Sequence, residues 1–155
     1  MEVKEILRNL REQNNLTQEQ MAERVNVSRQ AVSRWETGET QPNTEMLKTL
    51  SKEFNVSINT LLGSPQQLIC QCCGMPLSDD SLISHEPDGA FNEDYCKWCY
   101  ADGKFVYQSK DVLLDFLVKQ MPNPDNQKDT DRRVLFDSHL SQLKHWKNQK
   151  SAVCK

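Results

Sequence analysis

The sequence has no hydrophobic run long enough to cross a membrane. Its most apolar stretch, residues 112–118, is short and is interrupted by Asp115, whereas a membrane-spanning helix needs about 20 apolar residues. The first ten residues are rich in charge, where a secretory signal would place an apolar segment. We therefore expect a cytoplasmic protein with no membrane partner.

The sequence also lacks the residue patterns that mark common enzymes. Its five glycines form no phosphate-binding loop. The three histidines, His85, His139 and His145, are isolated and give no Cys-His-Asp arrangement for nucleophilic catalysis. A thioredoxin-type cysteine pair would need βαβ surroundings, whereas Gly74-Met75-Pro76 is typical of a turn. We predict that the chain is not an enzyme.

No strong excess of charge is present, since the formal net charge of the 155 residues is −3. Residues 1–63 carry eight basic and nine acidic side chains, residues 64–125 carry four and ten, and residues 126–155 carry seven and three. The hydrophobic share of 37% is that of a globular protein. Any DNA binding must therefore come from a local patch rather than from bulk charge.

The first 63 residues have the apolar spacing of consecutive short helices. Thr17, followed by Gln20 three residues later, has the pattern of a capping box. Ser28 is a suitable N-cap for the helical segment that follows it. Two helices joined by a three-residue turn within residues 17–36 predict a helix-turn-helix.

The helix expected after Ser28 has one polar face. Ala31, Val32 and Trp35 can pack inward, and Gly38 is expected to end the helix in a left-handed conformation. The polar face comprises Ser28, Arg29, Gln30, Ser33 and Arg34. Arg pairs with guanine, Gln pairs with adenine, and Ser serves either base, so this face predicts a recognition helix in the major groove. The alternative is a helical interaction module whose polar face is only solvated.

Residues 3–62 resemble the Cro/repressor-type (XRE) helix-turn-helix family. The similarity rests on Thr17-Gln18, Met21-Ala22, the string VSRQAVSRWE and Pro42. The resemblance implies a five-helix, lambda-repressor-like domain that docks as a homodimer on a pseudo-palindrome in double-stranded DNA.

The same resemblance implies roles for individual residues. Gln18 is expected to touch a phosphate and to brace Gln30. The residues expected to approach bases or neighbouring phosphates are Ser28, Arg29, Gln30 and Arg34, with Ser33 and Thr37 close by.

Five of the six cysteines form two groups rather than a scattered disulfide framework. The pair Cys70-x-x-Cys73 is followed after 22 residues by Cys96-x-x-Cys99. Two such pairs can place four thiolates at the corners of a tetrahedron around zinc. Other large apolar residues are few in this segment, so a metal core is physically sensible. We predict that these four cysteines hold a zinc ion.

Three other possible ligands are set aside. Cys72 falls outside the two-residue spacing, so we expect it to be either a small buried residue or an exposed thiol. Four well-spaced cysteines leave no vacancy for His85. Cys154 lies next to the last residue, and we expect it to be unstructured.

The strings CQCCGMPL at residues 70–77 and YCKWCYADGKF at residues 95–105 resemble a zinc-ribbon domain of uncharacterised bacterial proteins. In some of these proteins the domain follows a helix-turn-helix. The similarity spans residues 69–147 and implies a metal-binding module without an agreed ligand.

Two further apolar stripes follow the cysteines at helical spacing. Their members are Val112, Leu113, Phe116, Leu117 and Met121, and then Val134, Leu135, Leu140, Leu143 and Trp146. We expect these residues to be core that packs on the ribbon. The alternative is that they form a dimer interface or a pocket.

The predicted fold is therefore mainly helical with a small zinc ribbon. We expect a helix-turn-helix domain at residues 1–63, a linker at 64–69, and a zinc ribbon with C-terminal helices at 70–150. The predicted function is that of a sequence-specific, dimeric transcription regulator. Two alternatives stay open: a zinc- or redox-responsive sensor with Cys72 as an exchange partner, and an antitoxin-like protein that binds a protein partner.

Overall fold

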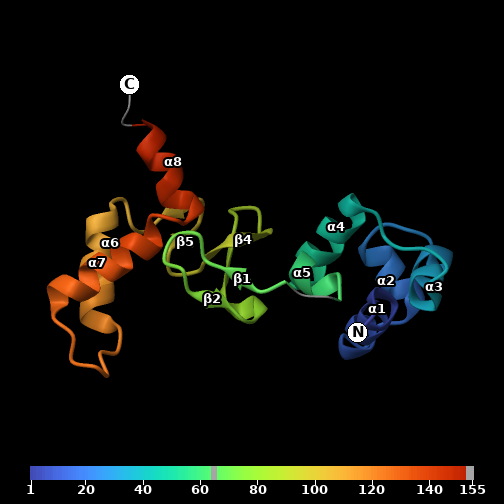
Figure 1. Cartoon of the computed structure of the whole chain (residues 1–155). Coiled ribbons are helices and arrows are strands. Elements are labelled where there is room, and N and C mark those ends of the chain that lie inside the picture. Colours follow the sequence, from blue (N-terminus) through green and yellow to red (C-terminus); the bar gives the residue numbers. More distant parts are fainter. Residues whose placement is uncertain (64–65, 153–155) are drawn as a thin grey trace. The chain divides into compact units, whose positions relative to one another are not determined.

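The structure, a computed structural model, describes residues 1–63 and 66–152 (Figure 1). Contacts divide the chain into two compact units. The first comprises Met1–Gln67 with Asp88–Phe91, and the second comprises Leu68–Pro87 and the residues from Asn92 onward. Within the described residues, no helix combines the length and the apolar character that crossing a membrane requires.

The first unit contains the five helices that the XRE resemblance implies. They are α1 (Val3–Gln13), α2 (Gln18–Arg24), α3 (Arg29–Thr37), α4 (Thr44–Phe54) and α5 (Ile58–Leu61). Local capping explains where they begin. The Thr17 side chain accepts from the Gln20 amide in a capping box, and the Ser28 side chain caps α3. Both predicted caps are confirmed.

One apolar core holds these helices together. Its buried members are Leu7, Leu10, Met21, Ala22, Val25, Val32, Trp35, Leu50 and Leu61. Trp35 is 7% exposed, which confirms its prediction as a core residue. Gly38 ends α3 with φ +80°, and a Cβ there would lie 3.1 Å from Lys4 Cδ. The left-handed turn that was predicted at Gly38 is therefore present.

The second unit begins with short strands that the sequence did not reveal. They are β1 (Leu68–Ile69), β2 (Pro76–Leu77), β3 (Ile83–His85), β4 (Phe91–Cys96), β5 (Tyr100–Ala101) and β6 (Lys104–Phe105), with a 3-10 turn at Asp80–Leu82. They pair in sequence order as three two-stranded sheets. In the antiparallel β1–β2 ladder, Leu68 faces Leu77. The β1–β2 ladder encloses the turn of Cys70 and Cys73, and the turn of Cys96 and Cys99 lies between the end of β4 and the start of β5. The strands therefore position thiols rather than build a broad sheet.

Three helices complete the second unit: α6 (Lys110–Gln120), α7 (Asp129–Leu140) and α8 (Lys144–Ala152). Helices α6 and α7 pack against each other. The guanidinium of Arg132, a residue only 7% exposed, donates to the carbonyls of Val118 and Met121 at 2.8 and 2.7 Å. Arg132 thereby satisfies carbonyls at the end of α6 that the helix itself leaves unbonded.

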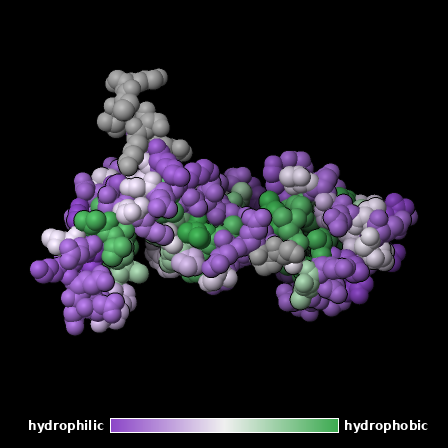
Figure 2. Space-filling view, viewed as in Figure 1, coloured by the Kyte–Doolittle hydropathy of each residue, from purple (hydrophilic) through white to green (hydrophobic). Residues whose placement is uncertain are grey.

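The prediction that the two apolar stripes are core is partly wrong. Leu113, Leu117 and Leu140 are buried, but Val112, Val134 and Leu135 are 57, 70 and 60% exposed. The buried side of α6 is formed by Leu113, Leu114 and Leu117, which turns Val112 toward solvent. Figure 2 shows hydrophobic residues on the surface over α6 and α7.

Candidate nucleic-acid interface and metal centre

The amino end of α3 presents its polar side chains to solvent. Ser28, Arg29, Gln30, Arg34 and Thr37 are exposed, and Ser33 is half-buried. The Ser28 hydroxyl accepts from the Ala31 amide at 3.2 Å. The Thr37 hydroxyl donates to the Arg34 carbonyl at 3.1 Å, and the Arg34 guanidinium lies 3.7 Å from the Glu39 carboxylate. Arg29 and Gln30 are thus free of the hydrophobic interior.

Gln18 contacts a different residue from the one that the resemblance implies. Its amide donates to Glu36 Oε2 at 2.9 Å, and no hydrogen bond joins it to Gln30 among the described residues. Glu36 is 3% exposed and lies in the last turn of α3. A buried carboxylate needs hydrogen-bond partners, and Gln18 supplies one of them. Gln18 therefore fixes α2 against α3 through Glu36.

Arg11 is the main partner of Glu36. Arg11 Nε lies 2.6 Å from Glu36 Oε1, and the Arg8 guanidinium donates to the Glu36 carbonyl at 3.2 Å. Burial disfavours the ionised form of Glu36, but hydrogen bonds from Arg11 and Gln18 outweigh it and lower the pKa of this carboxyl. This buried network ties α1, α2 and α3 together below the exposed polar face.

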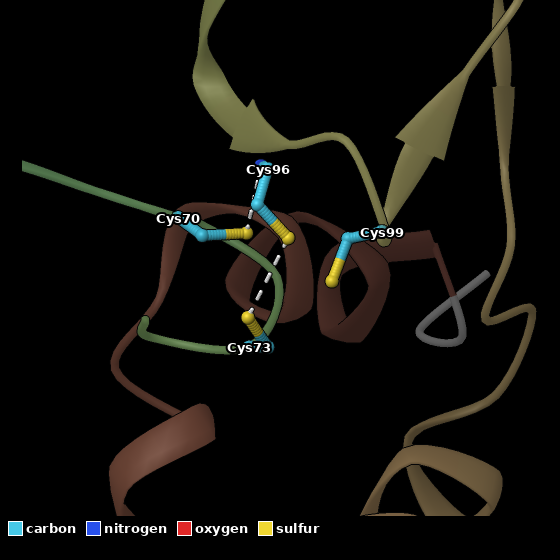
Figure 3. A group of neighbouring side chains, drawn as sticks. All are labelled: Cys70, Cys73, Cys96 and Cys99. Carbon is cyan, nitrogen blue, oxygen red and sulfur yellow. Dashed lines mark hydrogen bonds between the residues drawn. The ribbon is translucent and has the colours of Figure 1, made fainter. Parts of the chain in front are cut away.

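Four cysteine side chains from two turns converge in the second unit (Figure 3). The sulfurs of Cys70, Cys73, Cys96 and Cys99 all lie within 4.8 Å of one another. Cys73 Sγ and Cys96 Sγ are 3.9 Å apart. Zn–S bonds of about 2.3 Å place tetrahedral ligands roughly 3.8 Å apart, so this spacing fits a tetrahedral zinc ion.

The backbone around the cluster also suits thiolate ligands. The Cys96 amide donates to Cys70 Sγ at 3.3 Å, which favours a charged sulfur. Gly74 adopts φ +79°, and a Cβ there would lie 2.9 Å from His139 Nε2. A side chain at residue 74 would therefore push the exposed His139 imidazole aside and strain the left-handed backbone of the first cysteine turn.

The thiols cannot all ionise without a cation. A hydrogen bond from Cys73 lowers the pKa of Cys70, and the reciprocal hydrogen bond to Cys70 raises the pKa of Cys73. Neighbouring sulfurs, Cys70 first, together with burial, raise the pKa of Cys99. A divalent cation at the centre would stabilise all four thiolates at once. The donor set thus fits zinc.

The remaining candidate ligands lie outside the group of four sulfurs. Cys72 is fully buried, and its carbonyl accepts from the Trp146 indole at 2.7 Å. His85 is not part of the group, and Cys154 lies outside the described residues. Of the two forms that the sequence allowed for Cys72, the small buried residue is the one observed.

The two halves of the chain define a class of protein that combines an XRE-type helix-turn-helix with a zinc ribbon. Residues 7–61 match the helix-turn-helix family, and residues 69–147 match the family described as "Putative zinc ribbon domain". The second match covers just over half of the chain, so the chain belongs to this zinc ribbon family.

Two curated relatives match part of the chain. The HTH-type transcriptional activator BcrR of Enterococcus faecalis is 54% identical over 69 residues, which are 44% of this chain and 33% of BcrR. Antitoxin PezA of Streptococcus pneumoniae serotype 4 is 34% identical over 62 residues, 40% of this chain and 39% of PezA. The chain thus spans between a third and two fifths of these relatives. The matches support a DNA-binding transcription regulator.

Proposed function

We propose that the chain is a sequence-specific transcription regulator that inserts the amino end of α3 into the major groove of its operator. The observation that carries this proposal is the exposure of Arg29 and Gln30 in the first turn of a helix whose opposite side is buried through Val32 and Trp35. A recognition helix reads bases with its amino-terminal residues. Arg29 suits guanine and Gln30 suits adenine.

The neighbouring polar residues would position the helix. Arg34 and Thr37 lie further along the exposed side of α3, where phosphate oxygens flank a groove-bound helix. Ser28, at the amino end, and Ser33 would lie close to the bases. Gln18 can donate to a phosphate only through the second N–H of its amide group or after reorienting, since this group already donates to Glu36. The proposed role of Gln18 is therefore to hold α2 and α3 in a fixed position relative to each other beside the DNA backbone.

We further propose that two copies bind a pseudo-palindromic operator. One exposed turn of α3 contacts few base pairs, and pairing two copies on half-sites about 34 Å apart multiplies the specificity. The activator named among the relatives supports a role in transcription.

The proposed metal site comprises Cys70, Cys73, Cys96 and Cys99. When it is bound, zinc supplies a tetrahedral cross-link between the two cysteine turns and no reaction chemistry. The chain's own residues hold the thiolates in place, because the Cys96 amide bonds the Cys70 sulfur and the short ladders fix each turn. We assign this site a structural role.

Selection from random DNA with the zinc-loaded full chain tests the DNA-binding proposal. The recovered sequences should share a two-fold symmetric motif. Arg29→Ala and Gln30→Ala should each weaken binding to that motif by about 1–3 kcal/mol and relax specificity at one base pair per half-site. The matched control is Lys48→Ala, which removes an exposed charge on α4 paired with Glu45 and should leave specificity unchanged.

The proposal is wrong if the two α3 variants bind the selected sequence as tightly as the parent chain. A selected motif without two-fold symmetry would refute the proposed dimer, but it would be compatible with the proposed recognition helix.

A second candidate function is an autoregulating protein that binds a protein partner. The similarity to an antitoxin supports it. Affinity purification of the full chain from a native host would then recover one partner in a fixed ratio, and that partner would change operator affinity. Operator affinity measured across free zinc concentrations and with a mild oxidant tests the sensor alternative, which requires affinity to change with metal occupancy.

A further inference from the structure

A cavity of about 780 Å³ opens in the second unit between the cysteine turns and helices α6 and α7. Its apolar wall is formed by Phe116, Leu117 and Met121 of α6, Phe136 of α7, and Trp98 and Val106 from the strand region. Cavities of about 300–1,000 Å³ with apolar walls are typical of small-molecule sites. Trp98 and Phe116 are 50 and 46% exposed, so the cavity can be entered from solvent.

The lining of this cavity disfavours a charged occupant. None of the described residues that line it is Asp, Glu, Lys or Arg. The nearby guanidinium of Arg132, 5.7 Å from the centre of the Phe136 ring, is already bonded to the carbonyls of Val118 and Met121. The Lys97 ammonium lies 4.8 Å from the centre of the Trp98 ring on an exposed side chain. An anionic ligand would lose its hydration without gaining a buried ionic partner, because the lining adds only the thiolates of the proposed zinc site, Cys73, Cys96 and Cys99.

Two residues of the lining carry a polar side-chain group: His139 has its imidazole and Tyr107 has its hydroxyl. The structure records no side-chain hydrogen bond for either group within the described residues, so each is available to a ligand. A ligand with one hydrogen-bonding group could meet them while its remaining surface stays on the apolar wall.

We infer that this cavity is a binding site for an uncharged, largely aromatic small molecule with one hydrogen-bonding group. A second copy of the chain is a weaker fit, because Val134 and Leu135, the most exposed apolar residues of α7, do not line the cavity. A docking copy would cover those residues first. The inference concerns a ligand site that is separate from the DNA-binding face on α3.

A matched pair of fluorescent probes tests the inference on the zinc-loaded full chain. N-phenyl-1-naphthylamine is uncharged and carries one N–H group, and 8-anilino-1-naphthalenesulfonate has the same rings with an added sulfonate. The uncharged probe should bind one site per chain, and the sulfonate should bind at least about tenfold more weakly, because its charge is left unpaired. Equal or tighter binding of the sulfonate would overturn the inference, and so would binding of neither probe.

Variants locate the probe. Phe116→Ala should weaken binding of the uncharged probe about tenfold, because one aromatic wall is removed. Tyr107→Phe and His139→Phe test the two polar groups, and at least one of them should weaken binding severalfold. The control is Leu135→Ala, which removes an exposed apolar residue outside the lining and should leave binding unchanged. Equal losses for Phe116→Ala and Leu135→Ala would place the probe elsewhere and refute the assignment.

Three measurements on the same preparations separate the possible failures. Zinc content shows whether a variant has lost the metal site, and operator binding shows whether the first unit still works. Sedimentation with and without the uncharged probe examines the second-copy alternative. If the probe dissociates a dimer that Phe116→Ala also dissociates, the cavity is an interface between copies and the ligand assignment is wrong.

Discussion

The two units of the chain use different sources of stability. In the first unit, nine buried apolar residues from five helices form one core. In the second, four of the completely or almost completely buried residues are Cys70, Cys72, Cys96 and Cys99, and most of the strands are two residues long. Short ladders around thiols bury little apolar surface, so the proposed zinc ion would take the place of a large core. The first unit thus folds by hydrophobic burial, and we expect the second to need metal ligation in addition to hydrophobic burial.

Of the changes considered, zinc removal should have the largest effect, and it should destabilise the second unit but not the first. Chelation should abolish cooperative unfolding of the second unit, since apparent binding energies of structural zinc reach about 10–16 kcal/mol in small domains. The helices of the first unit should keep their protection. Amide hydrogen exchange followed residue by residue measures both responses.

Two cysteine variants provide a matched check of that result. Cys99→Ser removes one of the four clustered sulfurs, and Cys72→Ser alters a buried thiol outside the cluster. Zinc content should fall for Cys99→Ser and stay at one ion per chain for Cys72→Ser. If the second unit keeps its amide exchange protection without metal, then the two units do not differ in their need for zinc.

Loss of the buried ion pair between Arg11 and Glu36 should destabilise the first unit alone. Glu36→Ala leaves the partly buried Arg11 guanidinium without its main partner and should lower the free energy of unfolding by about 3–5 kcal/mol. Chemical denaturation monitored by helical circular dichroism measures the loss. Glu39→Ala is the control, because its pair with Arg34 is exposed and should change stability by less than about 1 kcal/mol.

The Arg11–Glu36 pair should also make the stability of the first unit depend on pH. Because the pKa of Glu36 is lowered in the folded chain, its contribution is present above the carboxyl's ordinary pKa of about 4.3. The contribution is lost as the pH falls through the lower folded-state pKa. Parent and Glu36→Ala should therefore converge in stability at acid pH, and parallel curves would contradict this account.

The apolar core of the first unit should be sensitive to a single truncation. Leu50 is fully buried, so Leu50→Ala should cost about 2–5 kcal/mol through lost burial and a residual cavity. Leu62, 51% exposed, provides the control Leu62→Ala. Zinc content should be unchanged in both variants, and a loss of zinc in Leu50→Ala would mean that the two units do not fold separately.

The smallest expected effect is at the carboxyl end of α3. Gly38→Ala places a Cβ on a residue with φ +80° and 3.1 Å from Lys4 Cδ, and should cost about 1 kcal/mol. The lysine side chain can move, so the backbone conformation sets most of the cost. Thermal unfolding of the first unit is the measurement, and an unchanged midpoint would contradict the expectation.

Local sequence signals predicted much of the first unit. Thr17 and Ser28 are caps, Gly38 ends α3 and Trp35 is buried, because each depends on neighbours within a few residues. The partner of Gln18 could not be predicted in this way. Glu36 lies 18 residues further along the chain, and its burial results from the packing of three helices.

In the second unit the cysteine spacing predicted the cluster of sulfurs, but the sequence did not predict the short strands, the exposed side of α7 or the cavity. A strand of two residues is too short to show alternation, so β1, β2, β5 and β6 left no signal. The apolar stripe of α7 appeared to be core, yet Val134 and Leu135 are exposed. The cavity beside the cysteines depends on which side of α6 faces the ribbon, and only the folded chain determines that.

The last described helix, α8, is bonded to the first cysteine turn and to β4. The Trp146 indole bonds the Cys72 carbonyl, the His145 amide bonds the Gln71 carbonyl at 3.2 Å, and the Lys144 ammonium lies 2.7 Å from the Asp94 carboxylate. Engineers who shorten this protein would therefore have to keep the sequence through Trp146. A version trimmed to Leu143 would leave the carbonyls of Gln71 and Cys72 without these two donors and would loosen the turn that carries two of the clustered sulfurs.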